Sequence, residues 1–309
     1  MEEYIKIIDA HTHLWLRQCA EVNGKSIYGM PDGRAMFMGE EVQMLPPFIT
    51  DGRNTAEILL SNMNYTRVSA AVVTQEFIDG LQNDYLMDVV RRYPDRFFVF
   101  GMADYRCPGW LGQIKRLVDA GFRGIKIPAA RLIGTDWRVR LDSDEMMQMM
   151  HLLETHDMLL HVELADGDKQ VPEMEHIIKE CPRLRIIIGH FGMVTRPHWM
   201  DQIRLAHHEN VYIECGGITW LFNDEFWPFP SAVRAIREAA DEVGIGHLMW
   251  GSDYPRTITA ITYKMSYDFI LKSKLLSWEE KCAFLSGNAQ RVFGFNHLID
   301  LPYIKNMSE

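Results

Sequence analysis

The sequence of 309 residues is poor in cysteine and has no basic run and no long apolar segment. Its five cysteines are odd in number and never stand in a CxxC spacing, which indicates neither a disulfide framework nor a thiolate metal site. A reducing cytoplasm fits this usage best. No apolar run reaches the roughly 20 residues of a membrane span, and the N-terminus is acidic. We therefore expect a protein that neither spans a membrane nor is exported.

Positive charge is also scarce. The net charge is −10, and the lysines and arginines are scattered along the chain. Because nucleic-acid binding needs clustered cations that neutralise phosphates, nucleic acid is not an expected partner. The hydrophobic content of 47% is typical of a globular protein with a large core. The expected partner is a small-molecule substrate.

Short apolar runs bounded by Gly, Pro or Asp recur along the sequence and predict strands, with segments of helical period between them. The strands are expected at 5–10, 68–74, 97–103, 123–127, 158–163, 185–190, 211–215 and 247–252, and the helices at 83–93, 108–120, 144–156, 171–180, 197–208 and 231–243. Strands that alternate with helices in this way predict an α/β fold, a single (β/α)8 TIM barrel that spans residues 1–309 as one domain.

Two segments depart from a minimal barrel. Residues 14–53 are too long and too rich in Gly, Met and Pro for a simple connection, so we expect a lid or insertion loop after the first strand. The side chains expected over the mouth of the barrel are Tyr28, Arg34, Met36 and Phe37. This loop also offers a contact surface for a homo-oligomer. Residues 286–293 predict a C-terminal helix that closes the barrel.

Polar residues close or follow the predicted strands, at the end of a TIM barrel where active sites lie. They are His11, His13, Lys126, His161, His190 and Asp253. Neutral imidazoles and carboxylates are good ligands for a borderline divalent cation. The sequence therefore predicts a metallohydrolase, in which a metal-activated water attacks the substrate.

Asp9, His11 and His13 alternate along the end of the first predicted strand. Side chains in a strand repeat every two residues, so at the end of a barrel strand these three point into the lumen. Two imidazoles thus arrive at one point, and we predict that His11 and His13 are metal ligands. The alternative is a pair of buried or surface histidines without a metal.

Two further histidines end the fifth and sixth predicted strands. His161 can supply a third ligand, and it shares its strand face with Glu163, a candidate substrate contact. The alternative for His161 is a core histidine. His190 is either another ligand or an imidazole that polarises the substrate carbonyl. We favour the catalytic role, because three histidines and an aspartate already fill a one-metal site.

Asp253 follows the last predicted strand, after Gly251, which permits a tight approach. A carboxylate there can contact the metal and the water together, accept the proton of the water, and return it to the leaving alkoxide. The alternative is a structural aspartate in a turn. We predict that Asp253 is both a metal ligand and the catalytic base.

Lys126 ends the fourth predicted strand. It either is carbamylated and bridges two ions, or stays cationic and holds a carboxylate or hydroxyl group of the substrate, and we favour the cationic role. A structural lysine is the third alternative. The remaining candidates for substrate binding stand just past strand ends: Trp15, Gln75, Arg131, Trp220, Tyr254 and Arg256.

Several segments together resemble the amidohydrolase superfamily, and within it the branch of lactonases and metal-dependent decarboxylases. The resemblance is carried by Ile8-Asp9-Ala10-His11-Thr12-His13-Leu14-Trp15, Gly121-Phe122-Arg123-Gly124-Ile125-Lys126, Ile188-Gly189-His190-Phe191-Gly192, Trp250-Gly251-Ser252-Asp253-Tyr254-Pro255 and Gly287-Asn288-Ala289. It implies one divalent ion, with His190 acting on the substrate carbonyl. The implied ligands are His11, His13, His161 and Asp253. Such a site accepts zinc, our first expectation, or manganese.

The signals for the subfamily point in two directions. Trp15, after the paired histidines, resembles the hydrolases of sugar and dicarboxylate lactones, whereas His161 resembles the metal-requiring decarboxylases. Three hypotheses follow. The first is a lactonase that opens a sugar or dicarboxylate lactone with a metal-activated water. The second is a non-oxidative decarboxylase of a hydroxylated or unsaturated acid, and the third is a barrel that binds a metal or ligand without turnover.

Overall fold

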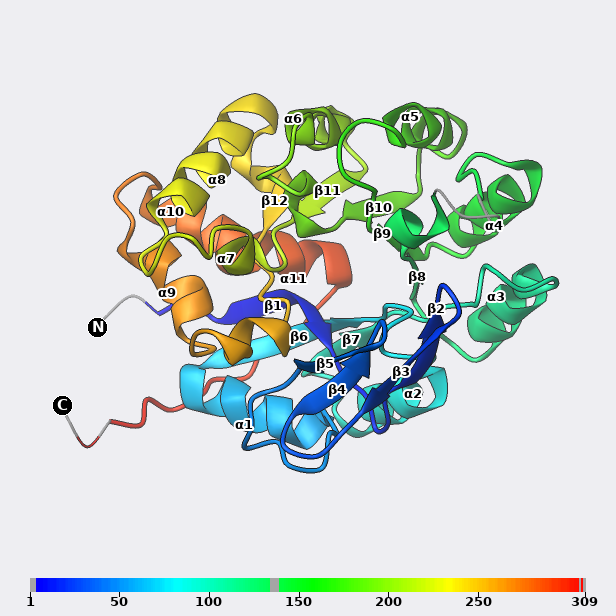
Figure 1. The fold of residues 1–309 in the computed structure, drawn as a ribbon. Helices are drawn as coiled ribbons and strands as arrows, with labels where there is room; N and C mark the ends of the chain where they lie inside the picture. The colour runs from blue at the N-terminus through cyan, green and yellow to red at the C-terminus, as the bar shows by residue number, and fades with distance from the viewer. Residues whose placement is uncertain (1–3, 134–138, 306, 308–309) are drawn as a thin grey trace.

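The computed structural model describes residues 4–133, 139–305 and 307. Within this part of the chain, eight parallel strands form a barrel (Figure 1): β1 (Ile7–His13), β6 (Val68–Thr74), β7 (Phe97–Val99), β8 (Gly124–Ile127), β9 (Leu159–Val162), β10 (Arg185–Ile188), β11 (Val211–Glu214) and β12 (Leu248–Met249). Each predicted strand has a counterpart here, so the predicted (β/α)8 TIM barrel is confirmed. None of the helices in the same residues is long and apolar enough to cross a membrane.

Two runs of hydrogen-bonded strands make up the barrel wall, β1-β6-β7 and β8-β9-β10-β11-β12 in the order of their neighbours. Backbone hydrogen bonds join the runs at both seams. At one seam the N–H of Lys126 donates to the carbonyl of Gly101 over 2.8 Å, and at the other the N–H of Ala10 donates to that of Trp250 over 2.9 Å. The wall is therefore a ring, and the carboxyl ends of its strands meet at one mouth.

Apolar side chains fill the interior of the barrel, because alternate residues of each strand point inward. Ile8 and Ala10 of β1 are fully buried in this inner cluster, together with Phe293 of α11 (Asn288–Phe293). The register of β1 against β6 shifts between Asp9 and Thr12, so strict alternation does not continue to the mouth, and Asp9 accepts hydrogen bonds from Ser252 and Tyr263 instead of joining the histidines. Arg123, just before β8, donates to the carbonyl of Phe293 over 3.3 Å, which places α11 at the end of the barrel where the strands begin. The predicted C-terminal helix thus covers the end opposite the mouth.

Helices surround the barrel wall (Figure 1). Those of the described residues are α1 (Ala56–Thr66), α2 (Asn83–Arg92), α3 (Trp110–Asp119), α4 (Asp144–Thr155), α5 (Val171–Glu180), α6 (Trp199–Ile203), α7 (Ile218–Leu221), α8 (Pro230–Val243), α9 (Met265–Lys272) and α10 (Trp278–Cys282), besides α11. In α8 the buried residues Ala232, Ile236 and Ala239 stand three and four positions apart, which puts them on the face that packs inward. The helix predicted at 197–208 is the short α6 followed by a 3-10 turn over Arg204–His207.

The long segment after β1 carries an antiparallel sheet where the sequence predicts a loop (dark blue in Figure 1). Its strands are β2 (Cys19–Val22), β3 (Lys25–Gly29), β4 (Arg34–Phe37) and β5 (Glu40–Gln43). The turn between β2 and β3 is Asn23-Gly24, with φ angles of 51° and 71°. Two successive positive φ angles suit a two-residue hairpin, and Asn-Gly is a pair that favours it. The sequence thus contained a hairpin signal that the predicted loop overlooks.

The strand bounds next to the mouth differ from prediction in a way that matters for the site. β1 continues to His13 and pairs with β6 as far as Thr74, so both predicted histidine ligands lie within the strand. β12 comprises only Leu248–Met249 of the predicted 247–252. The chain then leaves the sheet, and Asp253 adopts a positive φ of 58°.

Candidate metal centre

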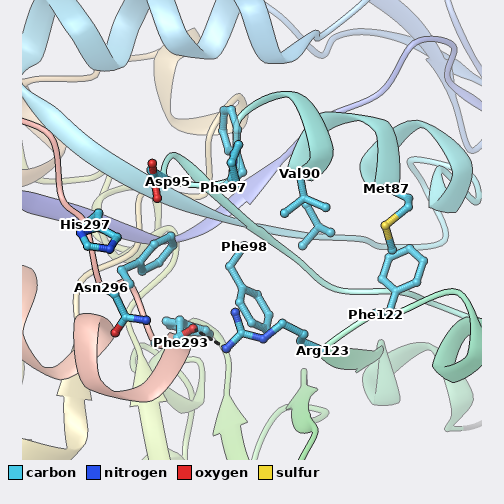
Figure 2. Close-up of a pocket in the computed structure, with 15 residues that line it drawn as sticks. Met87, Val90, Asp95, Phe97, Phe98, Phe122, Arg123, Phe293, Asn296 and His297 are labelled. Carbon is cyan, nitrogen blue, oxygen red and sulfur yellow. Dashed lines mark hydrogen bonds between the residues drawn. The ribbon is translucent and has the colours of Figure 1, made fainter.

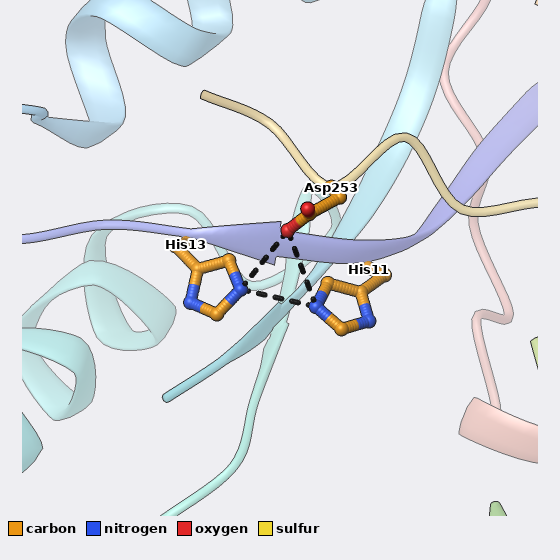
Figure 3. Close-up of side chains that lie close together, drawn as sticks. All are labelled: His11, His13 and Asp253. Carbon is orange, nitrogen blue, oxygen red and sulfur yellow. Dashed lines mark hydrogen bonds and ion pairs between the residues drawn. The ribbon is translucent and has the colours of Figure 1, made fainter. Parts of the chain in front are cut away.

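His11 and His13 of β1 converge with Asp253 at the mouth of the barrel (Figure 3). Their Nε2 atoms lie 3.0 Å apart, and Asp253 Oδ1 lies 3.7 Å from Nε2 of His11 and 3.4 Å from Nε2 of His13. The backbone N–H of Asp253 donates to the carbonyl of His11 over 3.0 Å, which ties the segment after β12 to β1. The structure thus brings three of the four predicted ligands together.

The charges around these atoms suit a divalent cation. Asp79, Glu163, Glu214 and Asp253 are buried carboxylates beside the two histidines, whereas Lys126 is the only buried lysine or arginine among the described residues. Buried carboxylates are costly unless cations or hydrogen bonds compensate them. Two imidazole nitrogens and a carboxylate oxygen form a donor set that zinc and manganese accept, so these residues fit a metal ion.

His161 of β9 lies on the other side of His11. Its Nε2 is 3.3 Å from Glu214 Oε1, and the same oxygen is 2.7 Å from His11 Nδ1, so the carboxylate stands between the two rings. Burial, together with the charge of Lys126, lowers the pKa of His161 to about 3, which keeps the ring neutral. Among the described residues, His161 shares a cluster with His11 and Glu214 but not with the other two predicted ligands. Its role as a fourth ligand stays a prediction.

Two carboxylates that the sequence did not single out contact the outer ring nitrogens of the paired histidines. Glu214, the last residue of β11, is 2.7 Å from His11 Nδ1, and Asp79, in the loop after β6, is 2.7 Å from His13 Nδ1. A signal for Glu214 was present, since it closes a barrel strand as the other site residues do. For Asp79 we find none, because it lies in a loop beyond the end of its strand.

Lys126 of β8 is fully buried and forms an ion pair with Glu163, the residue after β9. Glu163 Oε1 is also 3.3 Å from His190 Nε2, while His190 Nδ1 is 2.8 Å from the carbonyl of Gly216. Burial alone would lower the pKa of His190, but the carboxylate of Glu163 raises it to about 9. His190 is therefore a cationic imidazole near neutral pH, and Lys126 compensates the carboxylate that holds it.

Trp220 holds the second oxygen of Asp253. Its indole Nε1–H donates to Oδ2 over 2.7 Å, and the guanidinium of Arg256 lies over the indole ring at 3.8 Å. Burial would raise the pKa of Asp253, but the hydrogen bond from His13 and the charges of the other imidazoles lower it to about 2. Asp253 is thus an ionised carboxylate with Oδ1 directed at the paired histidines and Oδ2 engaged.

A cavity opens beside the three converging atoms. Its lining residues are His13, Trp15, Met44, Glu76, Ile78, Asp79, Arg131, Glu163, His190, Asp253, Pro255 and Arg256. The lining includes four of the predicted substrate-binding residues, namely Trp15, Arg131, Glu163 and Arg256. Two residues of the insertion, Trp15 and Met44, line the cavity. The four side chains expected over the mouth are not among its described lining: Tyr28, Arg34, Met36 and Phe37.

The other predicted substrate-binding residues are not among the described lining of this cavity: Lys126, Gln75, Trp220 and Tyr254. Lys126 and Trp220 contact lining residues, as the ion pair with Glu163 and the hydrogen bond to Asp253 show. Gln75 is fully buried and donates to the carbonyl of Phe100 over 2.7 Å. Tyr254 is also fully buried, and its backbone pairs with β1 at the barrel seam. These two residues support the wall of the site.

A second cavity lies at the opposite end of the barrel (Figure 2). Its labelled side chains include Phe97 and Phe98 at the start of β7 and Phe293 of α11. Arg123 lies 5.3 Å from the centre of the Phe98 ring. None of the predicted site residues is among its described lining. Active sites of TIM barrels lie where the strands end, so the cavity at the mouth is the candidate site.

The closed barrel and the cluster at its mouth define a class of protein. A sequence model described as Amidohydrolase matches residues 8–295, and the chain belongs to this family. The predicted superfamily is confirmed, and with it the prediction that the chain is an enzyme of the hydrolase class.

The more particular likenesses cover nearly the whole chain. L-fucono-1,5-lactonase of Burkholderia ambifaria is 28% identical over 313 residues, which cover 96% of each protein. An amidohydrolase from Burkholderia multivorans with bound zinc has a TM-score of 0.67 at 18% identity, and the match covers 93% of this chain and 99% of that one. 2,6-dihydroxybenzoate decarboxylase from Rhizobium has a TM-score of 0.60 at 16% identity, over 80% and 90%. The solved structures confirm the fold.

Proposed function

We propose that the protein is a metal-dependent lactonase that hydrolyses a sugar lactone. The observation that carries the proposal is the convergence of His11, His13 and the ionised Asp253 beside a cavity at the mouth of the barrel. The likeness to an L-fucono-1,5-lactonase over 96% of the chain supports a lactone as the substrate. A dicarboxylate lactone is the second substrate of the same class.

One divalent ion would be held by His11, His13 and Asp253, with zinc as the first choice and manganese as the second. The zinc in the Burkholderia multivorans structure supports this choice. His161, whose Nε2 lies 3.3 Å from Glu214 Oε1, stays the predicted fourth ligand. When bound, the ion supplies a Lewis acid beside the lactone carbonyl and makes a water molecule more acidic.

Asp253 accepts the proton of the attacking water. His190, held as a cation by Glu163, donates a hydrogen bond to the carbonyl oxygen as negative charge develops there. The ring C–O bond then breaks, and Asp253 returns the proton to the leaving alkoxide, which yields an open hydroxy acid.

The cavity is acidic at depth and basic at its rim. Asp79 and Glu163 are buried, whereas Arg131 and Arg256 are exposed. Arg131 already pairs with the buried Glu76, with 3.3 Å between Nε and Oε1, so of these two arginines Arg256 is the one that can bind a substrate carboxylate. Carboxylates accept hydrogen bonds from hydroxyl groups, and guanidinium groups bind carboxylates. We therefore expect the hydroxylated ring at depth and a substrate or product carboxylate towards the rim. This polarity favours lactone hydrolysis over decarboxylation, which needs the carboxylate close to the ion.

A pH-indicator assay of the zinc-loaded protein tests the proposal against sugar lactones, dicarboxylate lactones and dihydroxybenzoates. Lactone hydrolysis releases a proton, and decarboxylation takes one up. We expect acidification with a sugar lactone, reduced about 10²- to 10⁴-fold in Asp253→Asn because the base is lost. Alkalinisation with an acid substrate would establish the decarboxylase instead. Ligand binding by wild type and Asp253→Asn alike, without turnover of any compound, would indicate a binding barrel.

We propose the cytoplasm as the compartment, because none of the described cysteines forms a disulfide. A single domain and a homo-oligomer that uses the insertion sheet, β2 to β5, both stay predictions. Size-exclusion chromatography with light scattering tests the oligomer.

A further inference from the structure

We propose that Asp79 and Glu214 are positioning residues that fix the tautomers of His13 and His11 and thereby set the affinity for the metal ion. The inference rests on the metal centre of the proposed function. Neither carboxylate is among the converging ligand atoms. Each acts through the histidine that it contacts.

The argument begins with the hydrogen bond that each histidine makes on its outer side. Asp79 Oδ2 lies 2.7 Å from His13 Nδ1, and Glu214 Oε1 lies 2.7 Å from His11 Nδ1. An ionised carboxylate only accepts hydrogen bonds, so each Nδ1 carries the proton. A neutral imidazole has one N–H, and its other nitrogen then presents a lone pair.

Both lone pairs face the same point. His11 Nε2 and His13 Nε2 are 3.0 Å apart, and Asp253 Oδ1 adds a third acceptor within 3.7 Å of each. A divalent cation placed at this point would interact favourably with both imidazole nitrogens and with the carboxylate oxygen. The two outer carboxylates therefore prepare the site for a metal ion before the ion arrives.

Two backbone N–H groups bind the Glu214 carboxylate, and three glycines leave room for it. Its Oε1 also accepts the backbone N–H of His190 over 3.1 Å, and its Oε2 accepts the backbone N–H of Gly216. A Cβ atom would lie 2.7 Å from a Glu214 oxygen if placed on Gly189 or Gly216, and 2.9 Å if placed on Gly251. These glycines follow β10, β11 and β12, so three neighbouring strand ends leave room for this one carboxylate.

Asp79 is held by its own loop. Its Oδ2 accepts the backbone N–H of Glu76 over 3.0 Å, and its backbone N–H donates to the carbonyl of Glu76 over 2.9 Å. A Cβ on Gly80, which has a φ of +73°, would lie 2.6 Å from the carbonyl oxygen of Cys19 at the start of β2. The loop therefore packs against the insertion sheet, and that contact helps to place Asp79 beneath His13.

The inference can be tested without any substrate, by measuring the affinity of the protein for zinc. The protein is stripped of metal, and the dissociation constant for zinc is measured by competition with a chromogenic chelator. Partners that orient a ligating histidine typically contribute about 10- to 100-fold in metal affinity. We expect a loss of that size in Asp79→Ala and a smaller loss in Asp79→Asn, whose amide oxygen still accepts from Nδ1. Glu214→Gln should also weaken binding.

Glu76→Gln is the matched control. Glu76 is a buried carboxylate of the same loop and cavity, but no contact with a histidine ring is found for it among the described residues. If the contact with the histidine sets the affinity, and the negative charge of the cavity does not, Glu76→Gln should change the zinc dissociation constant by less than about twofold. An equal loss in Glu76→Gln and Asp79→Ala would overturn the inference.

Nitrogen-15 NMR of the metal-free protein reads the tautomer itself. We expect His13 with the proton on Nδ1 in the wild type and on Nε2 in Asp79→Ala. The inference would be overturned if Asp79→Ala bound zinc within twofold of the wild type or kept the wild-type tautomer. The proposed function would still stand in that case, provided that the wild type binds zinc and hydrolyses a lactone. A wild type that binds no zinc would overturn both. Asp79 lies in a loop, so its variants keep the test valid even if Glu214→Gln does not fold.

Discussion

At the scale of single residues, the chemistry of the site depends on which atom of each side chain is left available. Asp253 has Oδ2 engaged by Trp220, and His11 and His13 each have Nδ1 engaged by a carboxylate. The atoms that remain, one oxygen and two nitrogens, meet at one point. Residue types alone do not distinguish these atoms, because either oxygen of a carboxylate and either nitrogen of an imidazole can bind a metal.

The hydrogen bond from Trp220 gives a prediction at this scale. Trp220→Phe removes the indole donor but keeps an aromatic ring beneath Arg256. Hydrogen bonds to charged groups contribute about 1.5–3 kcal/mol, so we expect kcat to fall about 10- to 100-fold. Steady-state kinetics with the lactone identified by the indicator assay measures it, and KM should change little. Arg256→Met should instead raise KM, and the opposite pattern would contradict the assignment.

At the scale of elements, strand ends and the closing helix carry most of the positioning. β1 runs on through His11 and His13, whereas β12 stops early, so that Asp253 can bend back towards β1. The next barrel strands, β10 and β11, are each followed by a glycine that leaves space inside the mouth. The elements thus differ in length and residue size according to what each must place in the site.

A glycine substitution tests this space. In Gly216→Ala the new Cβ would lie 2.7 Å from both Glu214 Oε2 and the His11 ring. Overpacking of this kind costs about 1–3 kcal/mol, so we expect a lower free energy of unfolding in a urea titration. Gly246→Ala is the control, because a Cβ there has no neighbour within 4 Å. Its effect should stay within about 0.5 kcal/mol; equal effects would contradict the crowding.

The closing helix gives a second prediction at the element scale. Phe293 of α11 is 1% exposed in the inner cluster, and Phe226 is 77% exposed. Phe293→Ala should destabilise the protein by about 3–5 kcal/mol, because it leaves a cavity. Phe226→Ala should cost less than about 0.5 kcal/mol. Urea unfolding followed by circular dichroism compares them, and a mild effect of Phe293→Ala would mean that α11 does not support the barrel.

At the scale of the whole molecule, the candidate metal centre lies across a seam of the barrel. His11 and His13 belong to β1, and Asp253 follows β12, the strand that completes the ring. The acids lie inside the mouth and the arginines at its rim. An ion held by these residues would therefore join the first and last strands of the barrel.

Removal of the ion should lower the stability of the whole barrel. A ligand that binds only the folded state stabilises it by about 2.7 kcal/mol at a hundredfold excess over its Kd. We expect a chelator to lower Tm and added zinc to restore it, measured by scanning calorimetry. His11→Ala should retain no zinc after purification, and its Tm should not respond to zinc. A full equivalent of zinc in that variant would contradict the ligand assignment.

Much of this protein could be predicted from its sequence, because the relevant signals are local. Apolar runs between turn residues predict the barrel strands, and the spacing of His11 and His13 places both on one face of β1. The hairpin turn at Asn23-Gly24 was also a local signal, although the loop prediction passed over it.

Other features depended on contacts between distant parts of the chain. His13 and Asp79 are 66 residues apart, and His11 and Glu214 are 203 apart. Closure of the barrel brings each pair together, and it also puts Glu214 between His11 and His161. The sequence by itself determined where the strands lie, and that the paired histidines and the aspartate face the mouth, because side-chain period and strand ends are local properties. Only the tertiary structure decided which atom of each residue stays free, because that depends on partners that the folded ring supplies.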